Sequence, residues 1–166
     1  MDGDMVTRSL RAAALVSLLA VAVPVAAEPP APPAEAISAV AGPAAATVDA
    51  FHAALRRGDT AAASALLTDD ALIFEEGRAE RSKAEYALRH LGADAAFSQA
   101  VPGVISRRRG DAAGDFAWIA TEGRTRGRYR GSEVNRVTDE TMVLRRVGET
   151  WKIVHIHWSS AQSSVE

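Results

Sequence analysis

The sequence contains no cysteine, few aromatic residues and no excess of charge of one sign. Without cysteine, the chain forms no disulfide bond and carries no cysteine-linked lipid anchor. Nineteen Lys and Arg stand against 21 Asp and Glu, which gives a formal net charge of −2 at pH 7. Because no basic patch stands out, we expect no nucleic-acid partner.

The sequence also lacks an apolar run long enough to span a bilayer comfortably. The apolar stretch Ala12–Val23 follows Arg8 and Arg11, and the small residues Val25–Ala27 come directly before Glu28. This pattern is typical of a secretory signal peptide. The alternative is an uncleaved helix that anchors the chain to a membrane. We expect cleavage, a periplasmic or secreted protein, and no membrane contact afterwards.

The chain is therefore divided into four parts. Residues 1–27 form the signal peptide, and residues 28–43, rich in Pro and Ala, are expected to form a disordered tether. Residues 44–160 form one domain with one core, and residues 161–166 form a tail.

Helices are predicted in the first half of the domain. Residues 44–57 place Phe51 and Leu55 on one helix face. A second helix is predicted over residues 60–67. A third, over residues 82–91, begins with the capping pair Ser82 and Glu85 and is expected to end at Gly92.

Strands are predicted mainly in the second half, over residues 71–76, 96–109, 115–129, 135–146 and 151–160. Helices followed by a strand meander predict an α+β fold, with the helices on one face of a curved antiparallel sheet. Regular alternation in the last strand puts Trp151, Ile153, His155 and His157 on one face. It puts Lys152, Val154, Ile156 and Trp158 on the other.

Three motifs carry a resemblance to a known family. They are Gly58-Asp59 after the first helix, the turn Asp69-Asp70-Ala71, and Trp151-x-Ile153-Val154-His155-x-His157-x-Ser159. Together they resemble the NTF2-like superfamily, in particular its SnoaL-like and DUF4440 domains, ketosteroid isomerase and the association domain of calcium/calmodulin-dependent kinase II. The resemblance covers residues 44–160. It implies a cone, in which a strongly curved sheet wraps around the N-terminal helices, with a pocket at the open end.

The resemblance also implies roles for single residues. Glu75 matches the general base of ketosteroid isomerase, whereas Phe51 stands where that enzyme has a tyrosine and offers no hydroxyl. Trp158 stands where the association domain has an arginine, and Thr141 stands near the position of a second one. The implied pocket is therefore flatter and more apolar than that of the association domain.

The predicted pocket is lined by residues from the first helix, the third helix and four strands. They are Phe51, Leu55, Phe74, Tyr86, His90, Thr121, Thr141, Val154, Ile156 and Trp158. Strand parity then puts His155 and His157 on the convex face, where we expect a homodimer contact. A metal site on these two histidines, completed by His90, Asp94 or Glu85, is the alternative. We expect no metal and no cofactor.

Three functions stay open from the sequence. The first is binding of a small, partly apolar molecule in the cone. The second is a pocket enzyme of the SnoaL or ketosteroid isomerase type that uses Glu75 as general base, assisted by Tyr86 or His90. The third is a pure assembly module. A carboxylate that faces a cavity favours the enzyme, whereas a cavity closed by Trp158 and Phe51 favours assembly.

The signal peptide gives a direct prediction. The mature chain should begin at Glu28, because Val25–Ala27 presents the small residues that a signal peptidase requires. N-terminal sequencing of protein recovered from the periplasm or medium checks this. Recovery of a chain that still begins at Met1 or Met5 in a membrane fraction contradicts it.

Overall fold

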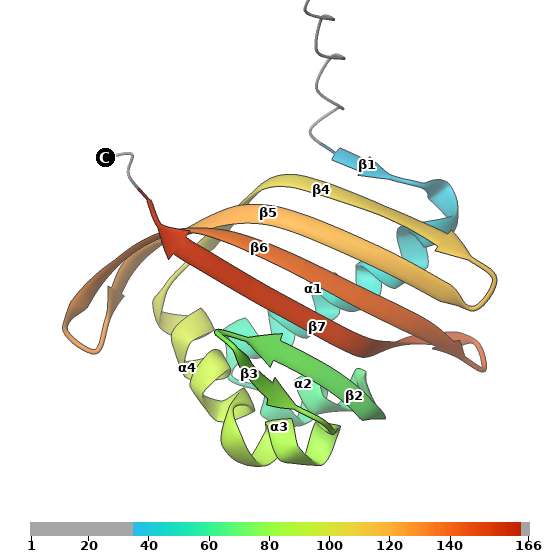
Figure 1. Ribbon diagram of the computed structural model, residues 1–166, viewed down its shortest axis with the longest axis horizontal. Coiled ribbons are helices and arrows are strands. Elements are labelled where there is room, and N and C mark those ends of the chain that lie inside the picture. The colour runs from blue at the N-terminus through green and yellow to red at the C-terminus, as the bar shows by residue number, and fades with distance from the viewer. Residues whose placement is uncertain (1–34, 164–166) are drawn as a thin grey trace, which may run out of the picture. The chain divides into compact units, whose positions relative to one another are not determined.

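The computed structural model describes residues 35–163 of the chain (Figure 1). The expected signal peptide, residues 28–34 of the expected tether and residues 164–166 of the expected tail lie outside the described residues. Among the described residues, every helix is too short or too polar to cross a membrane.

The helices come mostly before the long strands. A 3-10 helix, η1, spans Ala39–Ala41, and it is followed by α1 (Gly42–Arg57), α2 (Thr60–Ala65), α3 (Lys83–Arg89) and α4 (Leu91–Ala100). The strands are β1 (Glu35–Ile37), β2 (Leu67–Glu75), β3 (Arg78–Glu80), β4 (Gly103–Ala113), β5 (Phe116–Tyr129), β6 (Ser132–Val147) and β7 (Thr150–Gln162).

The strands form one seven-stranded sheet in the order β1-β4-β5-β6-β7-β2-β3. Strands β4 to β7 form the predicted antiparallel meander, while β1 pairs with β4 and β2 pairs with β7 in parallel. The sheet is thus mixed, because two N-terminal segments add to its two sides. The helices lie together on one side of the sheet, as Figure 1 shows. This confirms the α+β class with N-terminal helices.

The apolar core lies between the helices and one row of side chains across the sheet. Ile119, Met142, Ile156 and Ile73 stand opposite one another on β5, β6, β7 and β2, and all four are fully buried. From the helix side, Val48 and Phe51 of α1 and Tyr86 of α3 are fully buried in the same core. This row matters for the site, because inward-facing residues two positions further along each strand form the next row.

A β-bulge in β7 decides which of its side chains face the core. Val143 pairs with His155 and Leu144 pairs with Ile153, which leaves Val154 as an extra residue. As a result, Ile153 and Ile156 are both fully buried. The predicted regular alternation is therefore wrong before the bulge, since Ile153 faces the same side as Ile156.

The N-terminal boundary of the folded unit lies earlier than expected. Residues 35–43, predicted as part of a disordered tether, form β1, η1 and the start of α1. The reason is tertiary: β1 finds an edge to pair with on β4, and Ala41 is fully buried. At the other end, Ala161 and Gln162 of the expected tail continue β7 by pairing with β6.

The segment after α3 is helical rather than extended. Residues 96–100, predicted as the start of a strand, belong to α4, and Gly92 lies inside that helix. The buried residues Leu91 and Ala95 are four apart and give α4 an apolar face. Pro102 follows its end and β4 begins at Gly103. This helix places Asp94 in its first turn, close to His90.

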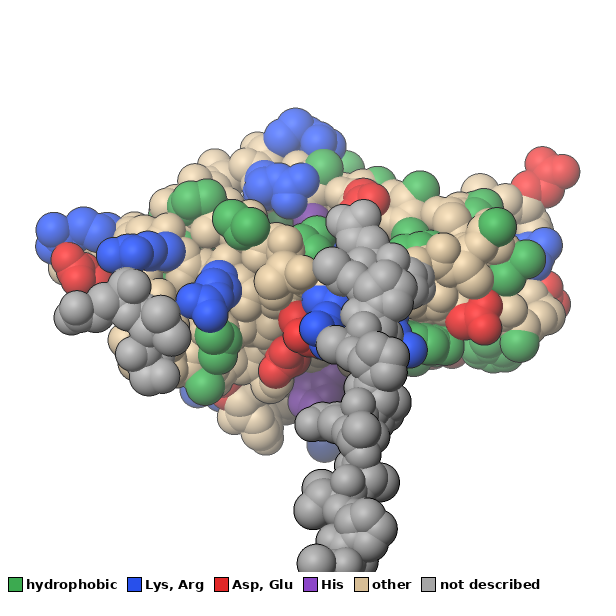
Figure 2. Space-filling view, turned by 90° about the horizontal axis from the view of Figure 1, so that it is seen from above, with side chains coloured by type: hydrophobic (Ala, Val, Ile, Leu, Met, Phe, Trp, Pro, Cys, Tyr) green, Lys and Arg blue, Asp and Glu red, His purple; other side chains and the backbone are tan. Residues whose placement is uncertain are grey.

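The molecular surface is mixed in charge where it can be seen. Figure 2 shows hydrophobic, basic and acidic side chains interspersed on one face of the molecule. No basic surface covers this view, in line with the nearly balanced composition.

Candidate active site

A cavity of about 600 Å³ opens between the helices and the inner face of the sheet. Its apolar wall includes Leu55, Phe97, Val101, Val104 and Ile105. Its polar wall is formed by one row of residues on five adjacent strands, namely Arg108, Thr121, Glu140, Trp158 and Glu75. We call these five residues the polar row.

The polar row follows from strand register. Arg108 pairs with Thr121, Thr121 with Glu140, Glu140 with Trp158, and Trp158 with Glu75. On β2, β5, β6 and β7, the member of the polar row is two residues away from a core residue of the same strand. Its side chain therefore lies on the same face of the sheet as that core residue. A bulge in β4 between Ile105 and Arg107 precedes the buried Arg108. The floor of the cavity is therefore polar directly beside the apolar core.

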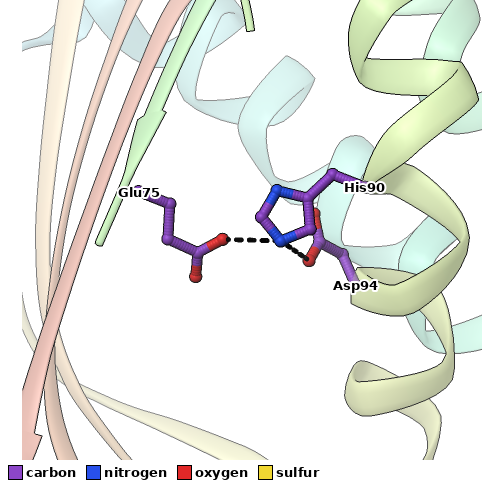
Figure 3. Close-up of side chains that lie close together, drawn as sticks. All are labelled: Glu75, His90 and Asp94. Atoms are coloured by element: carbon purple, nitrogen blue, oxygen red, sulfur yellow. Dashed lines mark ion pairs between the residues drawn. The ribbon is translucent and has the colours of Figure 1, made fainter. Parts of the chain in front are cut away.

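One end of the polar row meets a carboxylate–imidazole cluster (Figure 3). Glu75 reaches from β2 toward His90, which lies at the junction of α3 and α4, and Asp94 comes from the first turn of α4. The Nε2 atom of His90 lies 3.2 Å from Oε2 of Glu75 and 3.7 Å from Oδ1 of Asp94. The imidazole thus stands between two carboxylates at the cavity wall.

Two buried residues hold this cluster from behind. Glu80 of β3, with 7% of its side chain exposed, places Oε1 3.3 Å from Nδ1 of His90. The hydroxyl of Tyr86 donates a 2.6 Å hydrogen bond to Oδ2 of Asp94. Because both ring nitrogens of His90 face carboxylates, the ring can donate to both only when it is doubly protonated.

Burial and repulsion change the acidity of these groups. Burial raises the pKa of Glu75, and the nearby Asp94 raises it further. Burial likewise raises the pKa of Asp94, although the hydrogen bond from Tyr86 acts in the opposite direction. Burial and the same Asp94 raise the pKa of Tyr86 far above its usual range, so its hydroxyl stays protonated. A carboxylate with a raised pKa is a better general base near neutral pH.

A second cluster surrounds Glu140 in the middle of the polar row. The indole Nε1 of Trp158 donates a 2.7 Å hydrogen bond to Oε2 of Glu140. The Nε2 atom of His52, on α1, lies 2.7 Å from the same oxygen. Beside them, Arg108 contacts Oδ1 of Asp49 at 2.5 Å and donates from Nε to the hydroxyl of Thr121 at 3.1 Å.

The environment of Glu140 favours its charged form. Burial alone would raise the pKa of Glu140, but His52, the Trp158 hydrogen bond and Arg108 together lower it below its usual value. The two glutamates of one row therefore shift in opposite directions. Environments that separate two carboxyl pKa values are how enzymes assign acid and base roles.

The residues that could hold a metal ion are those of the first cluster. One ligand atom each from Glu75, His90 and Asp94 lies within 4.8 Å of the others. The contacts among these side chains and Glu80 already account for the arrangement, so the cluster by itself does not define a metal site. His155 and His157 contribute nothing to it, because they lie on the other face of the sheet, next to Phe74.

The predicted site residues separate into those that line the cavity, those that are buried beneath it and those that do neither. Glu75, Leu55, His90, Thr121 and Trp158 line the cavity. Phe51, Tyr86 and Ile156, predicted to line the pocket, do not line the cavity and are fully buried in the core that supports it.

Three further pocket assignments are wrong. Phe74 and Thr141 face outward, because their neighbours Ile73 and Met142 point into the core. Val154 is the extra residue of the β7 bulge and does not line the cavity.

Several site residues escaped the sequence prediction. The sequence pattern could have indicated Glu140, because this residue continues the alternation of Met142 and Leu144 on the inner face of β6. No sequence pattern indicates Arg108, because the face of β4 on which its side chain lies depends on the bulge at Ser106. Glu80 was hidden by the missed strand β3. Asp94 was named only as a possible metal ligand, and its position beside Glu75 and His90 depends on the missed helix α4.

Comparison with known proteins places this geometry in a family. Residues 44–163 match the SnoaL-like domain family. The structure of a candidate ketosteroid isomerase from Shewanella frigidimarina is 34% identical in sequence, covers 75% of this chain and 100% of its own, and gives a TM-score of 0.70.

More distant structures share the fold. A candidate calcium/calmodulin-dependent protein kinase II association domain from Xanthomonas campestris is 20% identical, covers 71% of this chain and 85% of its own, and gives a TM-score of 0.60. An NTF2-like protein of unknown function from Pseudomonas putida is 21% identical, with 74% and 87% covered and a TM-score of 0.61. These likenesses show an NTF2-like fold. No curated protein matches the chain in sequence.

The opposite pKa shifts predict opposite effects on stability. Because folding raises the pKa of Glu75, its charge destabilises the fold at pH 7, so Glu75→Gln should raise the free energy of unfolding there. The gain should vanish as the pH falls and the wild-type carboxyl takes up a proton. Because folding lowers the pKa of Glu140, Glu140→Gln should lower the free energy of unfolding at pH 7, by about 1–3 kcal/mol for a buried hydrogen-bonded group.

Chemical unfolding of both variants at pH 7 and pH 4 measures these differences. Glu149→Gln, at an exposed position in the β6–β7 turn, is the matched control and should change neither value. Equal destabilisation by Glu75→Gln and Glu140→Gln at pH 7 contradicts the assignment of opposite charge states.

Proposed function

Because the chain belongs to the SnoaL-like domain family, we propose that it binds a small, partly apolar organic molecule in its cavity and moves a proton on it with Glu75 as general base. The observation that carries this proposal is a half-buried carboxylate with a raised pKa on the wall of an open cavity. Trp158 and Phe51 stack on each other, with ring centroids 6.3 Å apart, yet a cavity of about 600 Å³ remains. The open cavity favours a pocket function over a pure assembly module.

The residues that line the cavity indicate the class of ligand. Apolar side chains at one wall suit a flat hydrocarbon body, while the polar row requires hydrogen-bonding groups on the ligand. A carbonyl compound with an acidic C–H bond beside the carbonyl meets both demands. The 34% identity to a candidate ketosteroid isomerase supports this reaction class.

The catalytic residues of ketosteroid isomerase are not all present at the matching positions of this chain. Phe51 has no hydroxyl and is fully buried, so it offers no donor to an oxyanion in the cavity. His90 acts on Glu75 by orienting its carboxylate, and Asp94 keeps the local charge negative so that Glu75 holds protons more tightly. We therefore assign Glu75 as the catalytic base and His90 and Asp94 as positioning residues.

We also propose that the protein works in the periplasm or outside the cell. The support is the pattern of two arginines, an apolar run and small residues within residues 1–27.

A second copy of the chain is our proposed protein partner. On the sheet face opposite the helices, Leu72, Phe74, Trp118, Val143, His155 and His157 form a continuous outer band by strand register. Phe74 and Trp118 are 37% and 43% exposed. Exposed apolar area on an uncovered sheet face is typical of a symmetric dimer contact.

A probe that reports any positioned base tests the catalytic proposal without knowledge of the substrate. In 5-nitrobenzisoxazole, removal of the ring C–H proton breaks the N–O bond and releases a coloured cyanophenolate. Wild-type protein should accelerate this elimination, and Glu75→Gln should lower the rate about a hundredfold, because general bases contribute on that order. The rate should rise with pH around a midpoint above that of an ordinary glutamate.

Glu149→Gln is the control for this assay, because it makes the same change outside the cavity and should match the wild type. If Glu75→Gln catalyses the elimination at the same rate as the wild type, the assignment of Glu75 as the base is wrong.

The dimer is tested by sedimentation at micromolar concentration. Wild-type protein should sediment as a dimer, and Trp118→Glu or Phe74→Glu should shift it to a monomer, because each places a charge in the outer band. Leu88→Glu is the matched control, since Leu88 is 86% exposed on α3 and lies outside the band. A monomeric wild type, or a dimer that both band variants leave intact, removes the proposal.

A further inference from the structure

We propose that His52, held by Glu140, is a second acid–base residue of the cavity and donates to the ligand oxygen on which negative charge develops. The inference rests on the proposed function, because it supplies the partner that a base at Glu75 requires. It also names the substrate class more closely, as a carbonyl compound whose oxygen reaches His52 while its reacting C–H bond faces Glu75.

The first support is the fixed position of the imidazole. His52 lies on α1, where its ring packs edge-on against Phe51 at a centroid distance of 5.8 Å. Its Nε2 lies 2.7 Å from Oε2 of Glu140, and that oxygen also accepts the indole N–H of Trp158 at 2.7 Å. With 8% of its side chain exposed, Glu140 is held in place by these two groups. A histidine oriented by a buried carboxylate is the usual arrangement of a proton-transfer group.

The second support is that one ring nitrogen remains available. Nε2 is engaged with Glu140, so Nδ1 is the nitrogen left for a ligand. No hydrogen bond to Nδ1 is formed within residues 35–163. The side chain is 29% exposed and lines the cavity. An imidazole with one nitrogen anchored and its exposed part at a cavity is suited to contact a bound molecule.

The third support is that the cation beside Glu140 is engaged by protein groups. Arg108 contacts Asp49 through Nη1 and donates from Nε to the hydroxyl of Thr121. Arg108 also helps to keep Glu140 charged. Arg108 therefore stabilises the cluster around Glu140, next to the imidazole of His52.

The fourth support is the placement of the two acid–base groups. Glu75 and Glu140 flank Trp158 in the polar row, so their Cα atoms are two strand spacings apart, roughly 10 Å at about 4.8 Å per strand. Both side chains line the same cavity. A small molecule lying over Trp158 would have Glu75 at one end and His52 with Glu140 at the other.

The proposed step balances without a further reactant. The Glu75 carboxylate takes the proton from the carbon beside the carbonyl, and the C–H electron pair forms a C=C bond. The carbonyl π pair moves to oxygen, which takes the Nδ1 proton of a doubly protonated His52, while the ring keeps its Nε2 proton toward Glu140. Where the ligand carries a C=C bond next to this carbon, the Glu75 proton returns to the far carbon of the conjugated enol and the oxygen proton returns to His52, which restores the protein. The net reaction is an isomerisation by proton shift.

Binding of 4-nitrophenol tests the donor without turnover, because its phenolate oxygen resembles the charged oxygen of an enolate. We expect the wild-type protein to bind the phenolate, followed by its visible absorbance. His52→Gln should weaken binding about tenfold, in the range of a hydrogen bond to a charged group. Glu75→Gln should bind at least as tightly, because it removes a negative charge from the cavity. Arg57→Gln, exposed on the same helix and outside the cavity lining, should match the wild type.

Two variants separate donation from a structural role. Trp158→Phe keeps the ring over the cavity but removes the indole N–H from Glu140, so it should weaken binding less than His52→Gln does. The inference is overturned if wild-type protein does not bind 4-nitrophenol, or if folded His52→Gln binds it as tightly as the wild type. If phenolate binding depends on His52 while Glu75→Gln leaves the benzisoxazole rate unchanged, the proposed function fails and the donor site stands.

Discussion

The extra residue at Val154 decides which side chains of β7 face the helices, and the cavity depends on that choice. A regular strand that directed Ile153 inward would direct Ile156 and Trp158 outward. With the bulge, both Ile153 and Ile156 are buried, and Trp158 follows Ile156 to the inner face. Because β7 lies between β6 and β2, its register also aligns Glu140 and Glu75 on either side of Trp158.

The polar row shows how one sheet can hold two carboxylates in different charge states. Glu75 lies near Asp94 and Glu80, so burial and like charges disfavour its ionised form. Glu140 is more deeply buried, but an indole N–H, an imidazole and a guanidinium surround it and favour its ionised form. Burial depth alone would predict the reverse order. The partners of each carboxylate, rather than its exposure, therefore determine its role.

The local negative charge near Glu75 is a cost to stability, and it fits the role of catalytic base that we propose for this residue. Glu75, Glu80 and Asp94 converge on the single imidazole of His90. A purely structural cluster would be expected to balance its charges, since uncompensated buried charge destabilises a fold. An excess of carboxylates at the wall of a cavity is more typical of a site tuned for proton transfer.

The sequence predicted the fold well and the site in part. Helix α1, its end at Gly58 and strands β5, β6 and β7 carry strong periodic and turn signals, so their bounds were predicted to within a few residues. Val154 was misplaced, because a sequence pattern does not reveal where a bulge interrupts alternation. Phe74 and Thr141 lie on regular stretches and face outward, because their neighbours Ile73 and Met142 face the core. The position of Asp94 could be predicted only with helix α4. That helix forms despite Gly92, because Leu91 and Ala95 are buried in the core. The pairing of His52 with Glu140 joins residues far apart in the chain, and no local pattern indicates it.

Carboxyl titration by nuclear magnetic resonance tests the central claim most directly. Glutamate labelled with ¹³C at the side-chain carboxyl would give separate signals, and Glu75→Gln and Glu140→Gln would assign the two that matter. The structure predicts that Glu75 titrates above an ordinary glutamate and Glu140 below it, in the same sample. Titration of both signals together at the ordinary glutamate value, or in the reverse order, would contradict the account.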